Sequence, residues 1–220
     1  MVEQRGILVC PDCYSKAPLI KEPRCKKCGK SIVSMETEFC YDCNNREHFY
    51  EHGFSLWNYD DVMRKSIANF KYHHRREYVE FYAEEFARVF GEVIIGLKPD
   101  AFVPVPVHWT RYVERGYNQA QVLAEAIGAC LDIPVIDDLL VRSKRTVAQK
   151  TLDHRQRFQN LQHAFSISRK WESSVKKLNR LVIIDDIFTT GSTINSCARI
   201  LRQTGVTEVY FGVLCNGIGY

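Results

Sequence analysis

The stretch that most constrains the fold of this chain is Leu181–Thr193, which has the sequence LVIIDDIFTTGST. Its first four residues are apolar and three of them are β-branched, which is typical of a strand buried inside a parallel sheet. Two carboxylates, Asp185 and Asp186, follow where this strand would end, and a short polar loop comes next. Apolar residues then recur at spacings of three and four, which predicts a helix with one buried face. These residues are Ile194, Cys197, Ala198 and Leu201.

The loop between this strand and this helix is suited to binding an anion. Backbone N–H groups at the start of a helix point into one space and favour negative charge there. The hydroxyls of the loop can add hydrogen-bond donors, and Gly191 lets the backbone come close to a ligand. The loop consists of Thr189, Thr190, Gly191, Ser192 and Thr193. It is not a Walker loop, because no lysine follows the glycine.

The carboxylates beside this loop indicate what the anion belongs to. Asp185 and Asp186 are acceptors suited to a pair of vicinal sugar hydroxyls, so the combination predicts a ribose 5-phosphate site. The alternative is a buried strand that leads into an ordinary polar turn and a capped helix. We favour the binding site, because two adjacent carboxylates are costly to hold in a half-buried turn without a partner.

The run IIDDIFTTGST resembles the diphosphoribosyl-binding signature of type I phosphoribosyltransferases. The resemblance implies an α/β fold with a type I phosphoribosyltransferase-like parallel sheet flanked by helices. It implies that Asp185 and Asp186 hold the ribose 2- and 3-hydroxyls. It also implies that Thr189–Thr193 surrounds the 5-phosphate, and that Ile187 belongs to the same binding segment.

A second segment with basic residues precedes another predicted helix. Residues 101–107 have the sequence AFVPVPV, which predicts a strand that ends in a proline-stiffened turn. The next helix is expected to begin at Asn118, and Arg111 and Arg115 lie near its start, where an anion would be favoured. In a phosphoribosyltransferase fold this position faces the pyrophosphate half of the substrate. The alternative is a charged loop that faces solvent.

The cysteines predict a separate N-terminal module. Six of the nine cysteines form three C-x-x-C pairs, and each gap between pairs is eleven residues long. Two such pairs can supply four thiolates in a tetrahedron, which is the arrangement of structural zinc. We assign the zinc ion to two of the pairs, because the run CKKCGK forms a good knuckle; the ligands are then Cys25, Cys28, Cys40 and Cys43. The alternative, in which Cys10 and Cys13 replace Cys40 and Cys43, remains open.

Length and composition limit the remaining organisation. A chain of 220 residues that is 45% hydrophobic can bury one main core with a small appendage. We expect a zinc ribbon over residues 1–50 and a phosphoribosyltransferase-like domain over residues 51–220. A net charge of +4 does not by itself indicate nucleic-acid binding. The chain has no apolar run of about eighteen residues and no apolar secretory core near its start, so we expect a cytoplasmic protein without a membrane span.

Three features occur together in this chain: the C-x-x-C pairs, the PVP…RGYNQA…LA segment and the IIDDIFTTGST run. Together they resemble the ComF family of competence-associated proteins, in which a zinc ribbon is fused to a phosphoribosyltransferase domain. The resemblance extends over most of the chain, although the fuller family pattern has two complete ribbons and this sequence has one and a half. It implies a part in the uptake of transforming single-stranded DNA.

These observations support two main hypotheses. In the first, the protein is a Mg²⁺-dependent phosphoribosyltransferase, or at least a binder of phosphoribosyl pyrophosphate or a nucleotide-like ligand. Mg²⁺ would bridge the pyrophosphate and the ribose hydroxyls, Asp185 and Asp186 would orient the ribose, and Arg115 and Arg111 would stabilise the departing pyrophosphate. The polar, basic segment over residues 140–165 would form a mobile cover.

In the second hypothesis, a non-catalytic module reuses the fold to bind single-stranded DNA. Cations expected to be exposed would contact phosphates, and two tyrosines would stack on bases. The cations are Lys71, Arg75, Arg76 and the basic residues of the 142–157 segment, and the tyrosines are Tyr72 and Tyr78. A third, weaker possibility is a scaffold whose zinc ribbon docks a competence helicase or a channel component.

Overall fold

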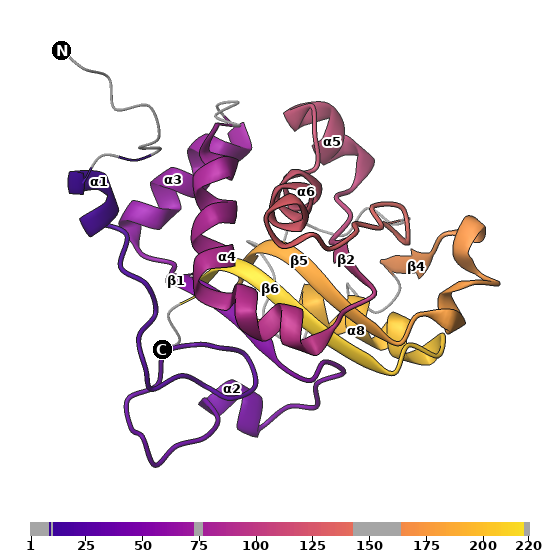
Figure 1. The fold of residues 1–220 in the computed structure, drawn as a ribbon, viewed down its shortest axis with the longest axis horizontal. Coiled ribbons are helices and arrows are strands. Elements are labelled where there is room, and N and C mark those ends of the chain that lie inside the picture. Colours follow the sequence, from indigo (N-terminus) through magenta and orange to yellow (C-terminus); the bar gives the residue numbers. More distant parts are fainter. Residues whose placement is uncertain (1–8, 10, 73–76, 143–163, 218–220) are drawn as a thin grey trace.

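The computed structural model describes residue 9 and residues 11–72, 77–142 and 164–217 (Figure 1). Its centre is a parallel sheet of four strands in the order β1-β6-β5-β2. The strands are β1 (Gly53–Asn58), β2 (Ala101–Pro104), β5 (Arg180–Phe188) and β6 (Glu208–Asn216). The predicted α/β fold with a parallel sheet is therefore confirmed.

Strand β5 occupies the middle of the sheet because its sequence can be buried on both faces. Leu181 pairs with Ala101 of β2 on one side and with Val209 of β6 on the other. The four apolar residues of its first half are fully buried. Leu181 and Ile183 face one half of the core, while Val182 and Ile184 face the other. Burial on both faces explains why the four residues between Arg180 and the two carboxylates are all apolar.

Helices cover both faces of the sheet. The first face carries α3 (Asp61–Tyr72), α4 (Tyr78–Leu97) and α6 (Gln119–Leu131), which meet Val182 and Ile184 in one core cluster. The opposite face carries α8 (Ser192–Gln203), whose apolar stripe packs against Leu181 and Ile183 (Figure 1). The short helix α5 (Trp109–Arg115) connects β2 to α6 and stands away from the sheet.

The remaining elements are short. A two-stranded antiparallel sheet packs on α8, and one-turn helices connect it to β5. Their bounds are β3 (Leu140–Arg142), β4 (Phe165–Ile167), η2 (Arg169–Trp171) and η3 (Val175–Lys177). In the N-terminal segment the helices are α1 (Pro11–Ser15) and α2 (Tyr41–Asn44). Among the described helices, none combines the length and the apolar character that crossing a bilayer requires.

The N-terminal cysteine segment packs onto the strand edge and onto α8. Ser55 Oγ in β1 and Asn216 Nδ2 in β6 both donate hydrogen bonds to the Cys28 carbonyl, at 2.9 and 3.1 Å. Gly29 has a φ of +70°, and a Cβ there would lie 2.6 Å from the Gly53 carbonyl oxygen. The glycine after the second cysteine is therefore needed both for its backbone conformation and for close approach to β1.

Candidate functional site

A cavity of about 1000 Å³ lies at the carboxyl ends of β5 and β2. Its wall combines the acid pair, which we define as Asp185 and Asp186, with the loop Thr189–Thr193. The segment after β2, the neighbouring ends of α5 and α6, and the last turn of α3 complete the wall. Ligands in α/β proteins commonly bind at this edge of the sheet, because loops and helix N-termini converge there.

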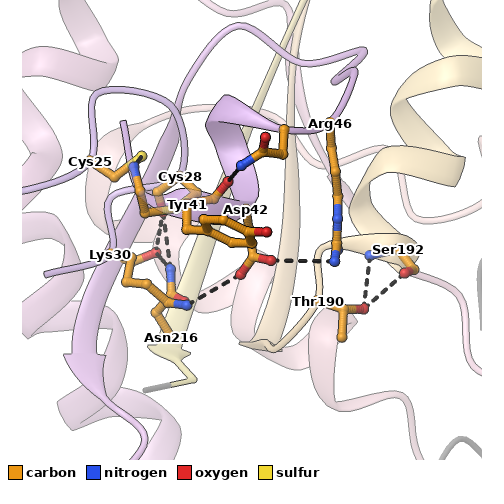
Figure 2. Close-up of polar contacts among 12 residues, drawn as sticks. Cys25, Cys28, Lys30, Tyr41, Asp42, Arg46, Thr190, Ser192 and Asn216 are labelled. Carbon is orange, nitrogen blue, oxygen red and sulfur yellow. Dashed lines mark hydrogen bonds and ion pairs between the residues drawn. The ribbon is translucent and has the colours of Figure 1, made fainter. Parts of the chain in front are cut away.

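The loop at the start of α8 is shaped by Gly191. This residue has a φ of +73° and forms the N-cap of the helix, and its carbonyl accepts a hydrogen bond from Asn195 N–H at 2.8 Å. A Cβ at this position would lie 2.5 Å from the ring of Phe188, so only glycine fits. Thr190 Oγ1 and Ser192 Oγ are 2.8 Å apart, as Figure 2 shows. The loop thus presents hydroxyls and a helix N-terminus to the same cavity.

The acid pair is held in place by the chain itself. Asp185 Oδ1 accepts a hydrogen bond from the Asp186 backbone N–H at 2.9 Å. Burial, and then the negative charge of Asp186, raise the pKa of Asp185 to about 7, and Lys71 and Arg142 oppose that rise. Asp186 Oδ2 lies 2.6 Å from Lys71 Nζ, in an ion pair whose two side chains are only 11% and 16% exposed. The two neighbouring acids therefore have different electrostatic surroundings.

Lys71 is a residue whose place the sequence analysis missed. The predicted exposure of Lys71 is wrong, because its side chain is only 16% exposed and lies in the cavity wall against Asp186. The spacing of α3 contained a signal: Ile67 is buried, and Lys71 follows it by four residues on the same helical face. The neighbouring Arg75 and Arg76 and the 143–157 segment lie outside the described residues.

The two arginines assigned to the pyrophosphate both line the cavity. Arg115 is held by its own chain, because its terminal nitrogens donate to Gln119 Oε1 at 2.7 Å and to Tyr72 Oη at 2.8 Å. Its guanidinium lies 4.8 Å from the centre of the Tyr72 ring, and its Nε is buried without a hydrogen-bond partner. Arg111 is half-exposed and lies 3.5 Å from Glu114. An incoming anion would meet a fixed Arg115 and a more mobile Arg111.

The tyrosines expected to stack on bases differ from each other. Tyr72 is 47% exposed at the cavity wall, while Tyr78 is half-buried and meets the ring of Tyr82 edge-on at 6.3 Å. Arg142, the first residue of the predicted basic segment, also lines the cavity. Burial lowers the pKa of its guanidinium, and it lies over the Phe165 ring at 5.3 Å.

The structure brings the sulfur atoms of four cysteines together in the N-terminal segment. Their ligand atoms all lie within 4.8 Å of one another, and the Cys28 and Cys40 sulfurs are 3.7 Å apart. A zinc ion at about 2.3 Å from four tetrahedral sulfurs would separate them by about 3.8 Å, so this cluster fits structural zinc. The four residues are Cys25, Cys28, Cys40 and Cys43. Cys10 and the side chain of Cys13 lie outside the described residues.

Two further contacts connect the segment after this cluster to α8 and to the start of the loop 189–193. Asn195 in α8 accepts a hydrogen bond from Phe49 N–H at 2.8 Å and donates one to the Glu47 carbonyl at 3.1 Å. Tyr50 packs edge-on against Phe188, the residue that supports Gly191. Figure 2 shows the cysteine knuckle and the start of α8 in the same region of the molecule.

Two domain models and several named proteins match this chain. The double zinc ribbon domain matches residues 2–44, and the phosphoribosyl transferase domain matches residues 86–219. Competence protein F from Haemophilus influenzae is 30% identical over 85% of this chain and 82% of its own length. Competence protein ComFC from Bacillus subtilis is 29% identical over 90% of this chain and 79% of its own. The DNA utilization protein YhgH from Escherichia coli K12 is 26% identical, with 94% and 90% covered.

Proposed function

Because the chain belongs to the ComF family, in which a zinc ribbon precedes a phosphoribosyl transferase domain, we propose that its cavity binds phosphoribosyl pyrophosphate or a related ribose 5-phosphate. The observation that supports this most is the shared cavity wall, in which the acid pair and the loop 189–193 face one space. A sugar phosphate has its diol and its phosphate on opposite parts of one small ring. A site with acceptors and anion donors in one cavity suits both groups.

Each half of the ligand has a matching group in the cavity. The 5-phosphate would lie at the N-terminus of α8, where the hydroxyls of Thr190 and Ser192 and the helix dipole favour negative charge. The 2- and 3-hydroxyls would donate to the carboxylates of Asp185 and Asp186. The pyrophosphate would lie toward Arg111 and Arg115 of α5, which both line the cavity.

We propose phosphoribosyl transfer as the reaction class. The acid pair would favour the positive charge that develops at the anomeric carbon, and the guanidinium of Arg115 in the cavity wall would favour the leaving pyrophosphate. Mg²⁺, bound with the substrate, would supply charge neutralisation on the pyrophosphate oxygens, and carboxylates are the type of ligand that it accepts. Because two of its nitrogens already donate hydrogen bonds within the chain, the Arg115 side chain would not have to reorient when the substrate binds.

The relatives' names support a proposal about the cellular setting. They are called competence and DNA utilization proteins, so we propose that this chain serves the uptake or processing of single-stranded DNA in the cytoplasm. Its zinc ribbon would then be the surface that docks a competence helicase or a channel component. Metal-dependent pull-down, lost when Cys25 and Cys28 are replaced, would support that partner.

A second candidate function is single-stranded nucleic-acid binding without catalysis. The observation in its favour is the exposed ring of Tyr72 beside Arg115, a stacking surface next to a cation. Such binding would weaken steeply with rising salt, because each phosphate contact releases counterions. A flat salt response in an oligonucleotide titration would contradict it.

Calorimetry with phosphoribosyl pyrophosphate and Mg²⁺ tests the main proposal. We expect heat of binding with the wild type and none with the double variant Asp185→Asn/Asp186→Asn. Asp61→Asn is the matched control, because Asp61 lies on the exposed start of α3 in a surface ion pair with Arg64. The proposal fails if the wild type gives no heat, or if the double variant binds as the wild type does.

A further inference from the structure

Lys71 is a charged residue of the cavity wall that the proposed function has not used. It sits in the last turn of α3, far in sequence from β5, and its ammonium group lies 2.6 Å from Asp186 Oδ2. The two side chains are 16% and 11% exposed, so water reaches this ion pair poorly. The ion pair therefore belongs to the packed wall of the cavity. It differs in exposure from surface pairs such as Lys16 with Asp12, whose side chains are 59% and 71% exposed.

The surrounding groups leave Lys71 as a persistent cation. Burial would lower its pKa, but attraction to Asp186 and to Asp185 raises it above the ordinary value. Arg115 and Arg142 add positive charge from α5 and β3.

Four further titratable groups interact with the pair and are uncharged at neutral pH. Burial raises the pKa of each of them. They lie, in chain order, in the segment after β1, in α4, in α8 and in β6. These groups are Tyr59, Tyr82, Cys197 and Cys215.

Two adjacent, poorly solvated carboxylates need a counterion. Without one, the pair either takes up a proton or recruits a metal ion, because neither charge can be left uncompensated away from water. Divalent cations commonly fill that role beside acidic pairs. In this chain a side chain already occupies the position, with its nitrogen at hydrogen-bond distance from a carboxylate oxygen.

We propose that Lys71 takes the place of a divalent cation at the acid pair, so that the ribose 5-phosphate half of the ligand binds without Mg²⁺. This inference rests on the proposed function and limits the need for Mg²⁺ to the pyrophosphate half. Lys71 is a positioning residue: it acts through Asp186, whose carboxylate it holds at 2.6 Å in the cavity wall.

The first test is a titration of the ligand-free protein. The carboxyl carbons of the acid pair are followed by ¹³C NMR as the pH is raised. Lys71→Met should raise the apparent pKa of the pair by about 1–3 units, because an opposite charge has been lost. Lys71→Arg should restore most of the wild-type curve. Lys65→Met, on the exposed side of α3, is the matched control and should leave it unchanged. A Lys71→Met curve equal to that of the wild type overturns the proposal.

The second test is calorimetry with ribose 5-phosphate, in EDTA and in Mg²⁺. The wild type should bind equally in both, whereas Lys71→Met should bind at least about tenfold more weakly in EDTA and recover in Mg²⁺. Wild-type binding that appears only with Mg²⁺ overturns this inference and leaves the proposed function standing. If neither condition gives binding, the proposed function fails, and the titration still decides whether Lys71 is the counterion. The wild-type comparison needs no variant, so poor folding of Lys71→Met leaves the proposal testable.

Discussion

The cysteine cluster and the acid pair both gather groups that carry negative charge, but they differ in where the compensating charge comes from. The four cysteines place their ligand atoms within 4.8 Å of one another, and the nearby Lys30 is directed to Asp42 at 3.7 Å. The acid pair has Lys71 at 2.6 Å. The first site therefore depends on an ion from outside, whereas the second is balanced by the chain and can exist before a ligand arrives.

The residues around the two sites also differ in burial. The cysteine segment exposes apolar side chains, with Val33 and Met35 at 104% and 81%. It has little core of its own, so the metal must supply much of its stability. The acid pair instead follows a strand whose apolar residues are fully buried. The sheet thus holds the acids in place, and a ligand is not needed for that.

Metal removal should have the largest effect, and should affect one region only. Chelation, or Cys28→Ser, is expected to unfold the cysteine segment, because zinc contributes about 10–16 kcal/mol in finger peptides. Hydrogen exchange would show lost protection over residues 25–44 and retained protection in β5 and β6. Cys130→Ser is the control, since Cys130 is exposed and outside the cluster. Unchanged exchange in the cysteine segment would show that the metal is not what holds it.

The acid pair should instead make the free energy of unfolding depend on pH. Because the folded state raises the pKa of Asp185 to about 7, its contribution to stability is complete below about pH 4 and is lost as the pH rises to about 7. Asp185→Asn removes this dependence, so from pH 4 to 7 the variant should gain on the wild type by at most about 1.4 kcal/mol per pH unit. Urea unfolding at several pH values measures it. Parallel curves for the two proteins would contradict the expectation.

A methyl group added to the loop 189–193 should separate the cost of backbone strain from the cost of a steric clash. Gly191→Ala adds a left-handed alanine and a clash with Phe188, and should cost about 2–5 kcal/mol. Gly116→Ala has a similar φ of +78° but open space around it, and should cost only about 1–2 kcal/mol. Denaturant unfolding compares the two variants. Equal losses would mean that Phe188 moves aside and does not shape the loop.

The connection between the two regions should give the smallest effect. Asn195→Ala removes both hydrogen bonds from α8 to the segment before β1, and should cost about 1–3 kcal/mol because two partly buried backbone groups lose their partner. Arg46→Ala, which removes a half-exposed ion pair with Asp42, should cost less than about 1 kcal/mol. Thermal unfolding of both variants provides the measurement. A larger loss of stability with Arg46→Ala than with Asn195→Ala would contradict this ranking of the two contacts.

The sequence alone determined those features that depend on spacing within one segment. The run from Leu181 to Thr193 predicted a buried strand, a polar loop and a helix, and all three are observed in that order. The predicted strand end at the acid pair is wrong, because β5 continues to Phe188, pairing with β6 up to that residue. The C-x-x-C spacing predicted a zinc ribbon, and both the family match and the four-cysteine cluster agree with it. These patterns are local, because strand alternation, helical periodicity and knuckle geometry repeat over a few residues.

Only the tertiary structure decided which side chains meet across the cavity. Lys71 and Asp186 are separated by more than a hundred positions, and no periodicity in either segment indicates that they pair. The same holds for Arg115, whose guanidinium is held by Tyr72 from another helix, and for Asn195, which binds the segment before β1. Such contacts depend on how helices pack on the sheet, and that packing is set by the whole core. Local pattern therefore specified the binding groups, and long-range packing specified their charge partners.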